Sequence, residues 1–469
     1  MERARGRLLY AGWGFIDQAL SSLSNFGVGL VAVRSSSSEE YGAFSVAFAT
    51  SVIGIGVARA LVSDVYSVRF AGGGRRVRAG APLDTSVGAD ADPEMEWIEA
   101  EEELAAPDDR SASDGREASE GPHQYPFAAG AWGAALMLSL IASVGCLAVG
   151  LIASGPLRGS MLILALGMPF LVLQDVVRFV CIARRDPFGA AFSDGSWVAG
   201  FAVAIVILRV VTGSSPGANA ALALWIVGAA CGVAAGVVRM SVVPRVGEGV
   251  RYARLVWRQS LRYVVDWLAL GASNQVGLYI LGATAGLAVL GETRTAFLIT
   301  GPINIVIMGA TMILVPELTR FRRRTGNRLF GAALAVSLVL EVAAMSWLGL
   351  VALMPDSVLE TILGDAASEA RTYLPALVVV SSLVMLAQGP VVCLRATGDI
   401  RRGTLASVPT APFMLFGAAA GAAITGDAPG AILGFATGYA VSGILSTWQL
   451  VLATRKPPIL FDTGHAENL

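Results

Sequence analysis

The chain has few charged residues and few of the side chains on which catalysis depends. Only 15% of its 469 residues are charged, against roughly 25% in an ordinary soluble domain. Lys456 is the only lysine and lies outside any GK[ST] motif, which excludes direct ATP hydrolysis on motif grounds. His123 and His465 both fall in predicted loops, and the four cysteines are far apart in apolar segments. We therefore expect no enzymatic activity, no cofactor and no metal site.

Long apolar runs dominate what is present. A membrane-spanning helix needs about 20 residues of low charge, and twelve stretches meet this condition. They lie near 8–33, 41–66, 127–153, 160–182, 188–211, 219–242, 259–285, 289–316, 329–354, 372–394, 403–425 and 428–452. The sequence therefore predicts an all-α integral membrane protein with about 12 transmembrane helices.

The basic residues predict how these helices are oriented. When twelve spans are threaded from a cytoplasmic N-terminus, most of the 34 basic residues fall in the cytoplasmic segments. Cytoplasmic loops carry the excess of arginine and lysine in membrane proteins. We therefore expect a multi-pass protein of the cell membrane with both termini in the cytoplasm.

One segment, 71–125, differs from the rest of the chain. Between residues 84 and 120 this segment contains 14 acidic residues but only two basic ones, Arg110 and Arg116. Such a composition cannot bury enough apolar surface to fold alone, so we predict a disordered cytoplasmic loop. It acts either as a solvated tether or as a docking site for a cytoplasmic partner.

The two halves of the sequence resemble each other. A shift of 249 positions aligns polar residues and a glycine of the first half with identical residues of the second. The pairs are Asp17 with Asp266, Ser24 with Ser273, Asn25 with Asn274, and Gly42 with Gly291. Six spans per half give both copies the same orientation, with an axis along the membrane normal. We predict two pseudo-symmetric six-helix lobes around a central cleft, with alternating access.

These lobes have predicted boundaries. The N-terminal lobe comprises 1–70 and 126–250, and the C-terminal lobe comprises 251–456. Residues 457–469 form a cytoplasmic tail.

The first span carries a stripe of polar side chains at helical spacing. Asp17, Ser21, Ser24 and Asn25 share one face. Lipid disfavours an exposed carboxylate by several kcal/mol, so the stripe must face water, another helix or a ligand. Hydrogen bonding between helices is the alternative interpretation.

Arginines within the spans are candidates for binding phosphate, because a guanidinium donates two parallel hydrogen bonds. Arg59 has no acidic residue at helical spacing, whereas Arg178 has Asp175 one turn away and could simply pair with it. Arg294, with Glu292, is placed at the outer end of the eighth span.

The stretch "SSSSEEYGAFSVAFAT" (35–50) resembles the loop and second helix of the polysaccharide-biosynthesis or O-antigen-type flippases. These belong to the multidrug/oligosaccharidyl-lipid/polysaccharide (MOP) superfamily. "WGFIDQALSSLSNFGVGLVAVR" before it is similar to the first helix of that family, and "LGETRTAFLITGPINIVIMGATMILVPELTR" (290–320) to its eighth. The acidic segment departs from the family pattern.

This resemblance implies a substrate, an oligosaccharide or glycolipid on a polyprenyl diphosphate that is moved from the cytoplasmic to the outer leaflet. Arg59 and Arg178 would hold the diphosphate. The partners implied are the lipid-linked glycan, the bilayer and polysaccharide-assembly enzymes. No nucleic-acid partner is expected.

The polar stripes complete the predicted substrate site. They add Asp17, Asn25, Asp266 and Asn274 to the two arginines. Asp17 and Asp266 are also the candidates for coupling transport to an ion.

Two alternatives remain at this point. A cation-coupled antiporter of the multidrug and toxin extrusion branch shares the two-lobe plan, and an aspartate in the first helix suits it. A non-transporting scaffold that recruits sugar-polymerising enzymes through the acidic segment is the second.

Overall fold

A computed structural model describes residues 2–70, 128–184, 186–270, 272–325, 329–397 and 399–455. Every regular element within these ranges is helical, as the sequence predicts. The acidic segment and the tail both lie outside the described residues.

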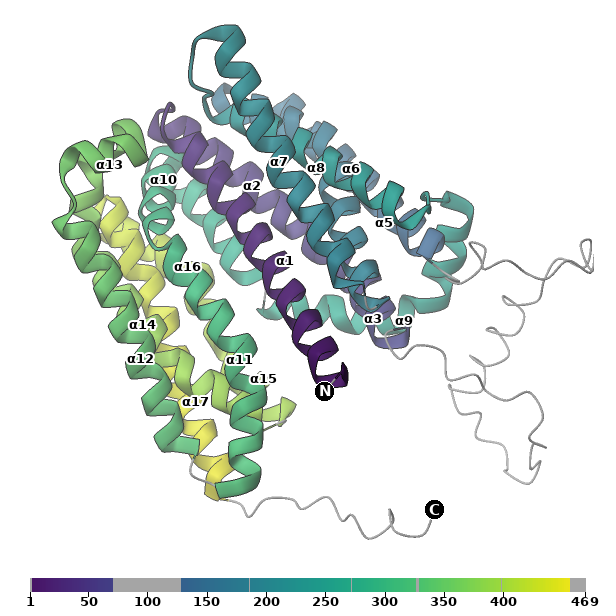
Figure 1. Ribbon diagram of the computed structural model, residues 1–469. Coiled ribbons are helices and arrows are strands. Elements are labelled where there is room, and N and C mark those ends of the chain that lie inside the picture. Colours follow the sequence, from purple (N-terminus) through teal and green to yellow (C-terminus); the bar gives the residue numbers. More distant parts are fainter. Residues whose placement is uncertain are drawn as a thin grey trace, which may run out of the picture.

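The helices form two lobes that are connected by α9 (Val246–Leu270) (Figure 1). The first lobe contains α1 (Glu2–Val33), α2 (Ser38–Ala58), η1 (Arg59–Ser63), α3 (Asp64–Phe70), α5 (Ala128–Ile152), α6 (Gly155–Ala183), α7 (Pro187–Thr212) and α8 (Ala218–Met240). The second contains α10 (Ala272–Ile299), α11 (Gly301–Thr325), α12 (Leu329–Leu353), α13 (Asp356–Leu363), η3 (Gly364–Ala366), α14 (Ala367–Ala396), α15 (Ile400–Ser407), η4 (Val408–Thr410), α16 (Ala411–Thr425) and α17 (Ala428–Arg455).

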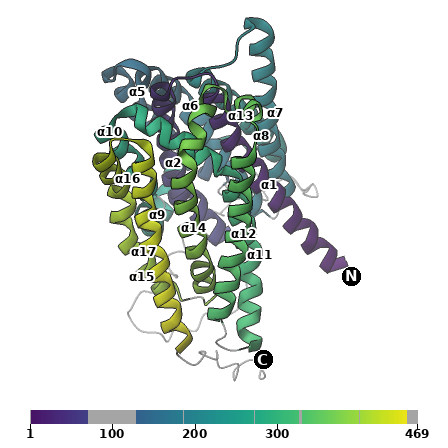
Figure 2. The same cartoon turned by 90° about the vertical axis from the view of Figure 1, so that its left-hand side faces the viewer.

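The hydropathy of these helices fits a bilayer. Ten helical segments of the described residues are long and apolar enough to cross a membrane. The long helices α1 and α11 are not among the ten, and α1 carries the polar stripe. Figure 2 shows the N-terminal end of α1 slanting away from the other helices. The expectation of an all-α, multi-span membrane protein with two lobes is confirmed.

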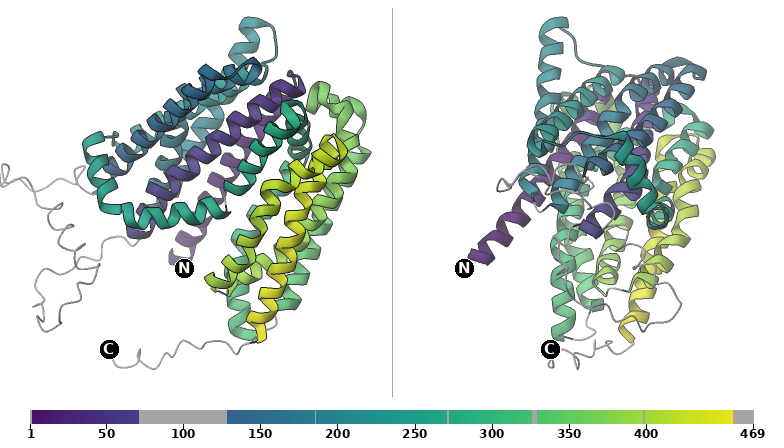
Figure 3. Two further views of the ribbon diagram at one scale, coloured as in Figure 1. Left: turned by 180° about the vertical axis from the view of Figure 1, so that it is seen from behind. Right: turned by 90° about the vertical axis from the view of Figure 1, so that its right-hand side faces the viewer.

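The seventh and eighth predicted spans, 259–285 and 289–316, are divided at Gly286 as expected, but each consists of parts of two helices. Residues 259–270 belong to α9, which runs across one end of the first lobe (Figure 3, left). The second lobe begins at Ala272, and the chain reverses at Gly286, whose φ of 90° is open only to glycine at low cost. The predicted lobe boundary between 250 and 251 therefore lies inside α9, whose Tyr252 and Ser260 bond to carbonyls of η1.

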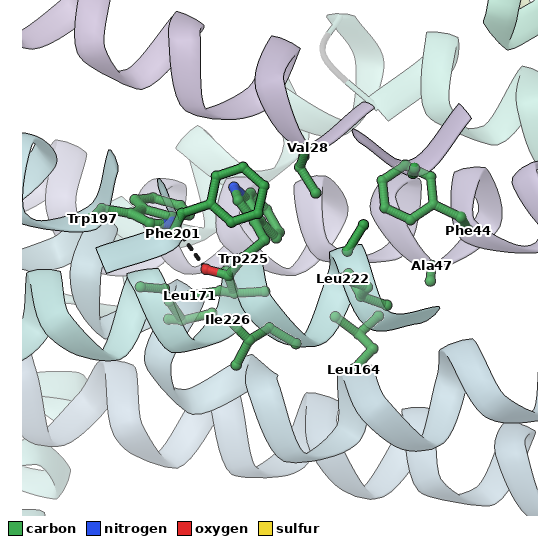
Figure 4. Packing of buried hydrophobic residues seen from close by; sticks show 14 of the residues in the cluster. Val28, Phe44, Ala47, Leu164, Leu171, Trp197, Phe201, Leu222, Trp225 and Ile226 are labelled. Atoms are coloured by element: carbon green, nitrogen blue, oxygen red, sulfur yellow. Dashed lines mark hydrogen bonds between the residues drawn. The ribbon is translucent and has the colours of Figure 1, made fainter. Parts of the chain in front are cut away.

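The core of the first lobe is organised around Trp225 of α8. Its indole N–H donates to the Ser24 hydroxyl at 2.9 Å, and its carbonyl accepts from the Trp197 indole at 2.9 Å. The two rings lie 5.1 Å apart, among buried side chains such as Leu171 and Phe201 (Figure 4). Burying an indole is favourable only when its N–H is satisfied, and these two bonds tie α1, α7 and α8 into one body.

The lobes touch where two equivalent glycines meet. A Cβ atom on Gly42 of α2 would overlap the carbonyl oxygen of Leu287, and one on Gly291 of α10 would overlap that of Ser38. Ser38 and Leu287 are themselves related by the shift of 249. The contact is therefore reciprocal, as a two-fold axis requires, and it supports the predicted duplication. The lobes diverge from this end toward the end where α1 begins (Figure 1).

We predict that Gly42→Ala and Gly291→Ala both disturb this contact and to a similar degree. A side chain forced into a closely packed contact costs typically about 1–3 kcal/mol, so the lobes should separate at this end. The measurement is the distance between spin labels at Ser35 and Glu360 by pulsed electron paramagnetic resonance, which should lengthen and broaden in both variants.

Gly349→Ala is the matched control, because a Cβ atom there meets no other atom within 4 Å. An unchanged distance distribution in both contact variants would show that these glycines do not set the approach of the lobes.

Candidate functional site

A cluster of buried charges lies inside the first lobe. Helix α6 supplies Gln174, Asp175 and Arg178, which lie within one turn or so of each other. The side chains of Gln174 and Arg178, four residues apart, project on one face of α6 toward α1 and α7. Asp175 is turned toward η1. The cluster thus joins four elements that are distant in sequence.

Arg178 lies at the centre of this cluster and is only 8% exposed. Its Nε atom is 2.7 Å from Oδ2 of Asp17 and 3.6 Å from Oδ2 of Asp194. Its Nη atoms donate to Gln18 at 2.9 Å and to Ser21 at 3.3 Å. Taking a guanidinium out of water is costly unless charge and hydrogen bonds compensate it, and here two carboxylates do so.

Arg59 is the second cation of the cluster and is more accessible. It begins the π-helical turn η1, a distortion often found at functional sites. Its Nε atom donates to Asp175 at 3.2 Å and its Nη2 atom to the other carboxylate oxygen. The guanidinium also lies 4.7 Å from the centroid of the Phe179 ring, and its side chain is 36% exposed. The intrahelical pairing of Arg178 with Asp175 is therefore not formed, because Arg59 takes Asp175.

The polar stripe of α1 divides between two roles. Asp17 and Ser21 bond to Arg178, and Ser24 bonds to Trp225. These three hold α1 against its own lobe, which is the helix-to-helix interpretation. Asn25 instead is exposed and faces the space between the lobes.

The corresponding stripe of the second half does not form one face. The side chain of Asp266 lies outside those that the structure describes, and its backbone belongs to α9. Ser273 and Asn274 lie on the next helix, α10. Asn274 is exposed to a cavity of the second lobe.

An inter-lobe cavity of about 280 Å³ lies between the halves. Its walls come from α1 and α2 on one side and from α10 and α11 on the other. The residues are Ser22, Asn25, Phe26, Gly29, Tyr41, Phe44, Phe48, Arg294, Phe297, Leu298, Gly301, Asn304 and Ile305. Phe48 and Phe297 are equivalent under the shift of 249, so the cavity is built from corresponding residues of the two lobes.

A C-lobe cavity of about 150 Å³ adjoins it. It shares Arg294, Phe297 and Asn304 with the inter-lobe cavity, and it also contains Asn274, Leu278, Thr300, Ile303, Val380, Ser381, Val384, Met385, Phe435 and Tyr439. Two of the six predicted binding residues, Asn25 and Asn274, thus line adjoining cavities. Arg59 and Arg178 line neither.

Arg294 is the cation that both cavities share. Its guanidinium lies 5.6 Å from the centroid of the Phe48 ring across the lobe boundary. Its Nε atom is buried without a hydrogen-bond partner, and no carboxylate among the described residues forms an ion pair with it. An unsatisfied buried donor is costly, so this group is suited to receive an acceptor from a ligand.

Sequence reasoning placed Arg294 at the outer end of a span and did not include it in the site. After Arg294 the predicted eighth span is bent between α10 and α11, because Pro302 lacks an N–H and excludes the carbonyl one turn back. The repeat itself held a signal, since Arg294 corresponds to the uncharged Ser45 in the first half.

Comparisons with known proteins place this geometry in a fold. No family model and no curated protein matches the sequence. An inward-facing MATE-family multidrug transporter of the MOP superfamily is 16% identical, with a TM-score of 0.57 over 94% of this chain and 98% of that one. The lipid II flippase MurJ in an inward closed conformation is 11% identical, with a TM-score of 0.56 over 96% and 88%. The chain has the fold of the MOP superfamily of membrane transporters.

The matches define the fold but not the substrate. An outward-facing MATE structure, 14% identical, reaches a TM-score of 0.50 over 96% of both chains. One matched fold therefore serves a multidrug transporter and a lipid flippase, and these structures are transporters rather than enzymes. The choice between them depends on the side chains of this chain.

We predict that Arg178→Met strongly destabilises the protein. Removing the cation leaves Asp17 and Asp194 buried without compensation, and breaking a buried pair in this way typically costs about 3–5 kcal/mol. The measurement is the free energy of unfolding in mixed micelles, followed by tryptophan fluorescence.

Arg239→Met is the control. Its ion pair with Asp186 has side chains 46% and 30% exposed, and such pairs contribute about 1 kcal/mol or less. Equal losses in the two variants would contradict the structural role of Arg178.

Proposed function

We propose that this protein moves an anionic, lipid-linked molecule across the membrane by alternating access of its two lobes. The observation that carries the proposal is Arg294, a cation without an ion-pair partner among the described residues, at the junction of two adjoining cavities. A cation in this position attracts phosphate and repels a cationic drug. The finer proposal is that the substrate is an oligosaccharide or related glycolipid on a polyprenyl diphosphate, for cell-surface polysaccharide.

The cavity suits the head of such a molecule. Around Arg294 are the amides of Asn25, Asn274 and Asn304 and the hydroxyl of Ser381. Amides and hydroxyls donate and accept hydrogen bonds, as sugar hydroxyls require. The rings of Phe48 and Phe297 add apolar surface for the faces of a sugar.

The arrangement of the lobes supports an inward-open state. The lobes meet near Gly42 and Gly291 and diverge toward the end where α1 begins. With the termini in the cytoplasm, as the distribution of arginines predicts, the open end faces the cytoplasmic leaflet, where the substrate is made. Moving a negative charge outward is then favoured by roughly 2.3 kcal/mol per 100 mV of interior-negative potential.

The two predicted arginines receive different roles in this proposal. Arg59, whose side chain is 36% exposed and which lies near the open end, binds the diphosphate first by exchanging Asp175 for a phosphate. Arg178 holds α1 in its lobe and does not touch the substrate. The lipid tail stays outside the inter-lobe cavity and the C-lobe cavity, and the sugar-phosphate head passes between the two lobes.

A second candidate is a proton-coupled antiporter, and the buried cluster favours it. Asp17, Asp175 and Asp194 face two guanidinium groups, Arg59 and Arg178. The cluster thus holds more carboxylates than guanidinium groups, and a coupled cation would offset this excess of negative charge. This gives ion coupling through Asp17 a physical basis, although Arg294 disfavours a cationic drug as the cargo.

Transport by proteoliposomes tests the proposal. We expect Arg294→Gln to reduce by at least ten-fold the translocation of a fluorescent polyprenyl diphosphate that carries N-acetylglucosamine, because the variant loses the cation that compensates the diphosphate. The readout is accessibility of the fluorophore to a membrane-impermeant quencher.

Arg209→Gln, which changes an arginine near the end of α7 that bonds to Ser215, is the control and should retain transport. Uptake of ethidium by the wild type, undiminished in Arg294→Gln and driven by a proton gradient, would favour the antiporter and overturn the flippase.

A further inference from the structure

A third, apolar cavity lies beside the C-lobe cavity, and the inference built on it deepens the proposed function and rests on it. The cavity measures about 320 Å³, within the range of ligand-binding sites. It is lined by Pro302, Ile303, Val306, Ile307, Leu340, Ala343, Ala344, Ser346, Trp347, Leu350 and Met385, from α11, α12 and α14. Apart from the Ser346 hydroxyl and the indole N–H of Trp347, every side chain in this wall is apolar.

The cavity originates at the bend between α10 and α11. Pro302 breaks the hydrogen bonding between α10 and α11, and the carbonyl of Ile299 is left to accept the indole N–H of Trp347 at 2.9 Å. This bond fixes Trp347 at the bend, between α12 and the start of α11. The two helices are therefore held apart over the next turns of α11, and the space between them is the cavity.

Part of the wall of the cavity is exposed at the surface of the protein. Val306 of α11 is 48% exposed and Leu350 of α12 is 54% exposed, and both line the cavity. Ala343 of α12 also lines it, is exposed and presents only a methyl group. A chain from the bilayer can therefore enter between α11 and α12 without crossing a polar surface.

The cavity adjoins the C-lobe cavity across two side chains. Ile303 and Met385 line both spaces. The sequence of cavities thus runs from the polar space around Arg294, past an isoleucine and a flexible methionine, to an apolar space open to lipid. Methionine adapts its shape to an irregular ligand. This order of a cation in a polar cavity, a shared wall of Ile303 and Met385, and an apolar cavity matches one molecule with an anionic head and a hydrocarbon tail.

We propose that the apolar cavity between α11, α12 and α14 binds the first part of the hydrocarbon chain of an amphiphile whose phosphate group lies at Arg294. The tail is thereby guided out of the protein on the α11–α12 side of the second lobe, while the head occupies the polar cavities. The charge of Arg294 distinguishes this ligand from bulk lipid, which would enter the apolar cavity with no requirement for a cation.

Photolabelling tests the proposal on the full chain in lipid nanodiscs. The probe is dodecyl phosphate with a diazirine at the end of its chain, and labelled peptides are identified by mass spectrometry. We expect label on residues of α11 and α12 that line the cavity, and at least five-fold less label with the uncharged diazirine analogue of dodecanol. We also expect a similar loss of dodecyl phosphate labelling in Arg294→Gln.

Variants that fill the cavity separate tail binding from head binding. Ala343→Trp should reduce labelling of the cavity by at least five-fold, because the indole occupies the space of the tail. Ala335→Trp is the matched control, since Ala335 is an exposed alanine of the same helix outside the cavity. Leu350→Trp, in the exposed part of the cavity wall, is a second filling variant should Ala343→Trp fail to fold.

Three results would overturn the proposal. These are equal labelling by the phosphate and the alcohol, labelling that is unchanged in both filling variants, and label located on other helices only. Each of them leaves the transport role of Arg294 intact if Arg294→Gln still abolishes translocation. Translocation that is insensitive to Arg294→Gln would instead remove the proposed function.

Discussion

The free-energy cost of an uncompensated charge in a low-dielectric interior governs how this protein is built. Arg178 is buried only because Asp17 and Asp194 lie against it, and Arg59 is held by both oxygens of Asp175. These pairs connect α1, η1, α6 and α7, so the first lobe depends on charges that no single helix could bury. Breaking such a pair costs far more than the pair itself contributes, which is why the polar stripe of α1 is directed into its own lobe.

The duplication sets the arrangement of the two lobes, and the positions at which the lobes differ set the charge of the cavity between them. Gly42 and Gly291 meet reciprocally at the lobe contact, and Phe48 and Phe297 line the cavity between the lobes. At one equivalent position the halves differ in charge, since Arg294 stands where the first half has a serine. In the proposed transport cycle the symmetric lobes rock between two states, and the asymmetric cation gives the cavity a preference for one sign of ligand charge.

Proline and glycine shape the second lobe where the ligand is proposed to bind. Gly286 lets the chain reverse, and Pro302 bends the chain between α10 and α11 at the level of the cavities. The indole N–H of Trp347 donates to the carbonyl of Ile299 that the bend leaves free. This bond removes the free-energy cost of an unsatisfied backbone group in a membrane. This local break in helical hydrogen bonding lies in the wall of the apolar cavity between α11 and α12.

The sequence by itself determined the helical membrane class and the two-lobe duplication, because hydropathy and the repeat at a shift of 249 can be read from the order of residues alone. It also singled out Asn25 and Asn274, which line the cavities. Tertiary structure decided which charge pairs with which. Arg178 pairs with Asp17 of α1 and Asp194 of α7 rather than with Asp175 of its own helix, and Arg294 became the cation at the cavities. Which ion pairs form in a bilayer depends on which helices are in contact. A single sequence does not specify these contacts, so it does not specify the ion pairs.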